Sequence, residues 1–189
     1  MKYIFLATLL MTSSLLWSCT QKETEAESET SLLDAFLVTE APADAQQISK
    51  VFEDPSPGRE VILSGEIMGQ MEPFADGYAI VTLGDPTKIT PCNRIPGDGC
   101  PTPWDNCCDD RAVIKKSITT IQFLDENGKV IKAGLKGYQG IKELSFLTVK
   151  GKIAEQSNAE NLLINATAFH VAEESPFKDA KPVEAPPTN

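Results

Sequence analysis

Five segments with strand character, separated by turn residues, most constrain the fold of this chain. Each is rich in branched or aromatic side chains, and apolar positions alternate with polar ones along much of its length, which is typical of half-buried strands. Apolar residues at helical spacing predict two short helices, one within residues 43–52 and one over residues 133–144. The predicted strands cover residues 60–68, 78–83, 112–124, 146–153 and 161–171. We therefore expect a mainly β domain.

The order of these elements resembles a five-stranded Greek-key barrel of the OB type. In that family a helix lies between strands three and four and covers one end of the barrel, which is where residues 133–144 fall. The resemblance is one of topology and implies an OB-like barrel with a cysteine-rich insert after strand two. The main alternative is a small β-sandwich or meander, which a nearly helix-free region 132–145 would favour.

The amino-terminal residues predict export and lipid anchoring. An apolar run over residues 3–17 follows the positive Lys2 and is too short for a settled membrane span, which is typical of a signal peptide. The run leads into Leu-Leu-Trp-Ser-Cys, which resembles the processing signal of bacterial lipoproteins. This resemblance implies that residues 1–18 are removed and that Cys19 carries acyl chains such as palmitate. It also implies a lipid-anchored place in the cell envelope, with the outer membrane favoured because Thr20 is not aspartate.

Composition divides the mature chain into three parts. Residues 20–30 hold four glutamates, one lysine and no branched apolar or aromatic side chain, so they cannot bury enough surface to order themselves. We expect an acidic flexible tether over residues 19–42, although its apolar patch around Leu33 could either pack on the domain or stay extended. The OB-like domain is expected over residues 43–172, and a disordered, proline-rich tail over residues 173–189.

The most unusual local feature is a cysteine-rich loop, residues 90–110, between the second and third predicted strands. It holds Cys92, Cys100, Cys107 and Cys108, and an even number of cysteines in an exported protein predicts two disulfides. A bond between Cys107 and Cys108 is disfavoured because adjacent Cα atoms lie about 3.8 Å apart, below the usual range of about 4.4 to 6.8 Å. Either Cys92 pairs with Cys107 and Cys100 with Cys108, or the partners are exchanged.

The same cysteines also allow a second kind of chemistry. Their spacing matches neither the two short pairs of a four-cysteine zinc site nor the C-x-x-C motif of redox enzymes. The neighbours Cys107 and Cys108 could nevertheless capture a soft cation such as copper(I).

No motif for catalysis or for a cofactor is present, so neither an enzymatic activity nor a cofactor is predicted. The lone His170 excludes sites built from several histidines and is expected to be structural. Residues 111–152 hold nine basic residues against three acidic ones, which we interpret as a solvated set of exterior positions.

The function that fits these features is a lipid-anchored, non-catalytic binding or interaction module of the cell envelope. Its partner would be an envelope protein, a glycan or a small ligand, bound near Tyr78, Trp104 and Phe123. Nucleic acid is not expected, because the domain is net acidic. The alternative is a copper- or zinc-binding protein, or a redox accessory protein, that acts through the loop from Cys92 to Cys108.

Overall fold

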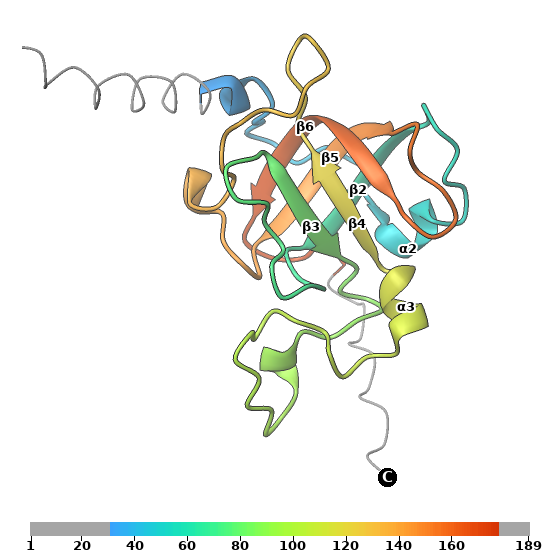
Figure 1. Cartoon of the computed structure of the whole chain (residues 1–189), viewed down its shortest axis with the longest axis vertical. Coiled ribbons are helices and arrows are strands. Elements are labelled where there is room, and N and C mark those ends of the chain that lie inside the picture. The colour runs from blue at the N-terminus through green and yellow to red at the C-terminus, as the bar shows by residue number, and fades with distance from the viewer. Residues whose placement is uncertain (1–30, 178–189) are drawn as a thin grey trace, which may run out of the picture.

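The computed structural model describes residues 31–177, and a closed β-barrel lies at its centre (Figure 1). The strands follow one another around the barrel as β2-β3-β4-β6-β5, and β5 pairs back with β2. Every neighbouring pair is antiparallel except β4 with β6, which is parallel. The five-stranded OB-like barrel predicted from the order of elements is therefore confirmed. Its strands are β2 (Glu60–Glu66), β3 (Ile80–Gly84), β4 (Ile118–Gln122), β5 (Phe146–Ile153) and β6 (Leu163–Ala172).

Two glycines allow the strands to approach where the barrel curves. A Cβ at Gly65 of β2 would lie 2.7 Å from the Ile48 side chain and 2.9 Å from the Gly84 carbonyl oxygen. A Cβ at Gly151 of β5 would lie 2.5 Å from the Asn165 carbonyl oxygen, beside a bulge in the pairing of β5 with β6. Both positions need glycine because a side chain has no room there.

The region predicted as a helix within residues 43–52 forms a two-residue strand and one helical turn. Strand β1 (Gln46–Gln47) pairs in parallel with β2, and helix α2 (Ile48–Val51) follows directly. Ile48 and Val51 are fully buried in the core cluster. This segment therefore adds apolar side chains to the core of the barrel.

The third predicted strand is too long at its start. Residues 112–117 were expected to be extended, but helix α3 (Arg111–Lys115) precedes β4. The Asp110 side chain accepts hydrogen bonds from the backbone N–H groups of Ala112 and Val113, which caps this helix. The cap stabilises a helical turn where the branched side chains alone suggest a strand.

The helix expected over residues 133–144 is reduced to one 3-10 turn, η3 (Tyr138–Gly140). Gly137 and Gly140 have φ angles of 90° and 76°, which lie in the left-handed region and stop a helix from continuing. Region 132–145 is thus nearly free of helix, which we expected to favour a sandwich. The pairing of β5 with β2 nevertheless closes the barrel. The absence of a helix in this region was therefore the wrong criterion for choosing between a barrel and a sandwich.

Residues 31–38 belong to the folded unit and not to a flexible tether. The 3-10 helix η1 (Leu32–Ala35) buries Leu33 completely in the core. The Val38 backbone N–H donates to the Phe169 carbonyl 2.9 Å away, and the His170 ring nitrogen lies 3.2 Å from the Val38 carbonyl oxygen. The predicted domain start at residue 43 was therefore wrong.

The predicted signal peptide, Cys19 and the rest of the tether lie outside the described residues, as does the tail from residue 178. Between residues 31 and 177, no helix has the length and apolar composition needed to cross a membrane.

Candidate functional site

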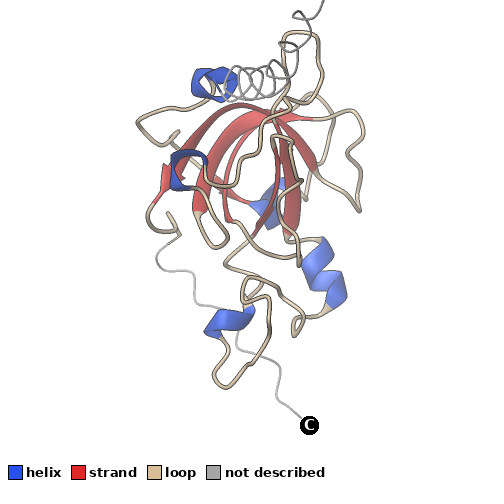
Figure 2. Cartoon of the chain, turned by 60° about the vertical axis from the view of Figure 1, so that its left-hand side comes forward, coloured by secondary structure: helices blue, strands red, loops and turns tan. Residues whose placement is uncertain are grey.

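The cysteine loop, residues 90–110, projects from one end of the barrel between β3 and α3 (Figure 2). It contains one short 3-10 helix, η2 (Cys92–Arg94), and its two sides are joined by backbone hydrogen bonds. The Cys92 N–H donates to the Asp105 carbonyl at 2.8 Å, and the Asn93 N–H donates to the Pro103 carbonyl at 2.9 Å. These bonds hold the two sides of the loop in a fixed register.

An ion pair between a buried carboxylate and a half-buried guanidinium fastens the loop to the barrel. Glu66, at the end of β2, is completely buried, and its carboxylate accepts two hydrogen bonds from the Arg94 guanidinium, at 2.9 and 2.5 Å. Burial raises the pKa of Glu66 above its ordinary value, and the positive charge of Arg94 opposes that rise. The pair therefore fixes the base of the loop at the end of a barrel strand. Neither residue was singled out in the sequence as a fastening point.

Trp104 forms a second fastening, to the connection between β2 and β3. Its indole N–H donates to the Met71 carbonyl at 2.8 Å, and its own carbonyl accepts from the Gly69 N–H at 3.2 Å. The side chain is half-buried, as expected of a residue that packs locally.

The four cysteines of the loop gather at one place as free thiols. The Sγ atoms of Cys92 and Cys107 lie 3.5 Å apart, and those of Cys107 and Cys108 lie 3.9 Å apart. A disulfide bond is about 2.05 Å long, so none is formed within residues 31–177. The sulfur of Cys100 lies within 4.8 Å of that of Cys107. Sequence spacing predicted that these residues would come together, and they do.

The environments of the thiols differ. Burial raises the pKa of Cys92 well above the usual range, and a hydrogen bond with Cys107 raises it further. Hydrogen bonding with Thr102 lowers the pKa of Cys100. For Cys107 the hydrogen bond with Cys92 lowers the pKa, but burial and the neighbouring Cys108 outweigh it, so its pKa is raised. Cys92 is thus a protected thiol at the base of the group, whereas Cys107 and Cys108 are exposed.

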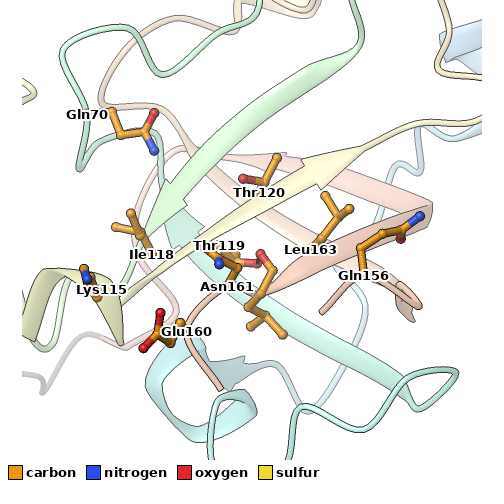
Figure 3. A pocket seen from close by; sticks show the side chains of 10 residues that line it. Gln70, Lys115, Ile118, Thr119, Thr120, Gln156, Glu160, Asn161 and Leu163 are labelled. Carbon is orange, nitrogen blue, oxygen red and sulfur yellow. Dashed lines mark hydrogen bonds between the residues drawn. The ribbon is translucent and has the colours of Figure 1, made fainter. Parts of the chain in front are cut away.

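A second site, which we call the polar groove, lies on the barrel and has a volume of about 330 Å³ (Figure 3). It follows β4 and is bordered by the β2–β3 connection, by α3 and by the β5–β6 connection. Ligands of OB barrels bind on the face of the second and third barrel strands, here β3 and β4, between the same two connecting loops. Of these two strands, β4 lines the groove and β3 does not. Its lining residues are Gln70, Lys115, Ile118, Thr119, Thr120, Gln156, Glu160, Asn161, Leu162 and Leu163.

The groove combines polar walls with a partly apolar floor. Figure 3 shows amide side chains from Gln70, Gln156 and Asn161 around the space. Lys115 and Glu160 supply one charge of each sign, so the site has no net charge. This composition suits a neutral ligand that carries hydroxyl or amide groups.

The three predicted ligand-surface residues do not form one surface in the structure. The prediction that Phe123 lies on a ligand surface was wrong, because this residue is completely buried. Its ring makes edge-to-face contacts with Phe36 and Phe169, at centroid distances of 5.3 and 5.1 Å. Tyr78 is 45% exposed, but neither it nor Trp104 lines the groove. Strand alternation should have indicated that Phe123 shares the inward face with the fully buried Ile121.

Sequence reasoning missed the groove because its lining side chains come from several separate segments. No local motif marks them: residues 154–160, with Gln156, were left between two predicted strands, and Asn161 was predicted as the start of the second. A comparison of the sequence with protein-family models finds no match, and a search of curated proteins finds none either.

Proposed function

We propose that this protein is a non-catalytic binding module of the cell envelope, anchored by lipid on Cys19, with its ligand in the polar groove. The observation that carries the binding role is the groove itself, which shares β4 and two connecting loops with the face on which OB barrels bind ligands. Its volume of about 330 Å³ is at the lower end for small-molecule sites, which suits one or two sugar rings.

A glycan is the ligand class that the lining favours. Side-chain amides both donate and accept hydrogen bonds, as sugar hydroxyl groups require. Ile118 and Leu163 offer apolar surface to the C–H faces of a ring. The opposite charges of Lys115 and Glu160 leave the groove without net charge, which favours a neutral sugar over a phosphorylated one.

Binding can be tested by titrating the protein with neutral and N-acetylated oligosaccharides and following backbone amide signals by NMR. Signals around Gln156 and Asn161 should shift. Replacing either residue by alanine should weaken binding about tenfold, since each change removes one or two hydrogen bonds to the ligand. Gln46→Ala, an exposed amide in β1 outside the groove, is the matched control. Unchanged affinity in both groove variants would contradict the proposal.

The anchoring part of the proposal rests on the amino-terminal sequence. Because each buried methylene adds about 0.8 kcal/mol, several acyl chains on Cys19 would hold the protein at a membrane, with the outer membrane expected. Cys19→Ser should abolish acylation, which metabolic labelling with a fatty acid measures. Labelling of this variant equal to that of the wild type would contradict lipid anchoring through Cys19.

We propose that Cys92 and Cys107 form a disulfide once the protein reaches an oxidising compartment. Their sulfurs lie 3.5 Å apart, close enough for a bond after small side-chain rotations, which supports this pairing. Cys100 and Cys108 are then left for a second bond. Peptide mapping of unreduced protein tests the connectivity, and a Cys92–Cys108 crosslink would contradict it.

A further inference from the structure

The sulfur cluster, formed by Cys92, Cys107 and Cys108, has a geometry that suits a metal ion. All three Sγ atoms lie within 4.8 Å of one another, with two of the separations at 3.5 and 3.9 Å. Metal–sulfur bonds of about 2.3 Å place the sulfurs of a trigonal or tetrahedral centre about 3.8 to 4.0 Å apart. Small side-chain rotations would therefore bring all three sulfurs to one ion.

We propose that the reduced cysteine loop is a binding site for one copper(I) ion, held by the sulfurs of Cys92, Cys107 and Cys108. This site goes beyond the ligand-binding role of the polar groove, with which it shares no residue.

The loop presents these sulfurs in a way that favours capture from solution. Cys107 and Cys108 are exposed and give an ion access, whereas Cys92 is buried and closes the site from below. The backbone bond from Cys92 to Asp105 and the ion pair of Arg94 with Glu66 hold the base of the loop in place. Little ordering is then needed when the ion binds, which favours affinity.

The donor set selects the ion. Three thiolate sulfurs are soft ligands that favour copper(I) or zinc over hard cations. Zinc takes a fourth ligand for its tetrahedral geometry, which here would have to be water or the Asp98 carboxylate, 3.9 Å from the Cys108 sulfur. The remaining thiol, Cys100, groups with Asp105 and Cys107 and not with Cys92 and Cys108. Copper(I) is satisfied by three thiolates, so it fits the cluster as it stands.

The metal and the proposed disulfide exclude each other. When copper(I) binds, the three thiols release their protons and bind as thiolates, and no electron is transferred. When Cys92 and Cys107 form a disulfide, they lose two protons and pass two electrons to the disulfide of an exported thiol–disulfide oxidoreductase. Two of the three thiolate ligands are then gone. Oxidation would therefore release the ion.

The test uses reduced, full-length protein in detergent under anaerobic conditions. Copper(I) is supplied as its complex with a chromophoric chelator, and transfer to the protein is read from the loss of colour and from native mass spectrometry. We expect one copper ion per chain. No transfer to the reduced protein would overturn the proposal.

Two single variants separate the metal site from the disulfide. Cys108→Ser removes a proposed ligand but leaves the Cys92–Cys107 pair, so it should lose copper binding and still form that disulfide. Cys100→Ser is the matched control, because it also removes one thiol outside that pair, and it should keep copper binding. The proposal is overturned if the two variants bind copper equally well, or if Cys100→Ser alone loses binding.

Two further measurements complete the test. Oxidised wild-type protein should take up no copper, and uptake equal to that of the reduced form would overturn the proposal. Zinc should compete only weakly, and a preference for zinc that depends on Cys100 would overturn the three-sulfur assignment. Sugar titrations of the groove variants are independent of the thiols, so failure of the groove is distinguishable from failure of the copper site.

Discussion

The barrel and the cysteine loop belong to one chain but are held together by different forces. The core cluster of the barrel consists of aliphatic and aromatic side chains and includes no residue between Leu83 and Ile121. The loop lies within that gap and depends on backbone hydrogen bonds, on the ion pair of Glu66 with Arg94 and on its sulfurs. A change in the redox or metal state of the loop should therefore leave the core packing unchanged.

The largest expected effect is on the barrel. Phe123→Ala removes a completely buried ring that contacts Phe36 and Phe169, and it should lower the free energy of unfolding by about 3 to 5 kcal/mol. Denaturant unfolding measures this loss. Trp104→Ala, in the loop, should lower the free energy of unfolding by clearly less than Phe123→Ala does. Equal losses would mean that the loop and the barrel share one core.

The ion pair at the junction comes next. Arg94→Ala leaves Glu66 buried without a partner and should cost about 3 kcal/mol at neutral pH. Glu66→Gln leaves a guanidinium that is 39% exposed and still reached by water, so its cost should be much smaller. A larger loss for Glu66→Gln than for Arg94→Ala would contradict this asymmetry.

The pH dependence of the Arg94→Ala variant has a definite sign. Burial already raises the pKa of Glu66, and removal of the opposing arginine charge should raise it further. The folded state then favours the protonated carboxyl. The contribution of Glu66 to the stability of the variant is therefore greatest below its unfolded pKa of about 4.3. It falls as the pH rises through the pKa of Glu66 in the folded state. Unfolding curves at pH 4 and pH 8 should show a larger loss, relative to wild type, at pH 8.

The proposed disulfide should stabilise the protein by up to about 3 kcal/mol, since Cys92 and Cys107 are 15 positions apart. Thermal unfolding with and without a reductant measures this difference. We expect proteases to cleave the loop more readily when it is reduced, while the backbone amides of the barrel strands stay protected from hydrogen exchange. Equal loss of protection in both regions would contradict the independence of the loop.

The smallest expected effect concerns helix α3, which connects the loop to β4. Asp110→Ala removes the side-chain cap and should lower stability by about 1 kcal/mol. Asp110→Asn is the matched control, because asparagine also caps helices and should keep most of that stability. Equal losses in the two variants would show that the cap does not stabilise this junction.

The barrel strands were predictable because their side chains alternate along the chain. Strand β5 covers the predicted residues 146–153, and β6 differs from its prediction by one or two residues at each end. Helix α3 was missed because its branched residues suggest a strand, and only the side chain of Asp110 reveals the cap. The prediction of a helix over residues 133–144 was wrong because Gly137 and Gly140 have positive φ angles there.

The two candidate sites, the cysteine loop and the polar groove, were predictable only in part. The meeting of four thiols follows from their closeness in sequence, so Cys92 and Cys107 were found. The groove depends on residues as far apart as Gln70 and Leu163, which only the closed barrel brings together. Burial of Leu33 likewise depends on a distant partner surface, which a short apolar patch does not specify.

We propose above all that this protein is exported and anchored by lipid. The most direct test is mass spectrometry of protein extracted from membranes. We expect a chain that begins at Cys19, carries acyl chains there and contains a Cys92–Cys107 crosslink in its unreduced form. A full-length chain recovered from the soluble fraction with residues 1–18 intact and all its thiols free would contradict the proposal.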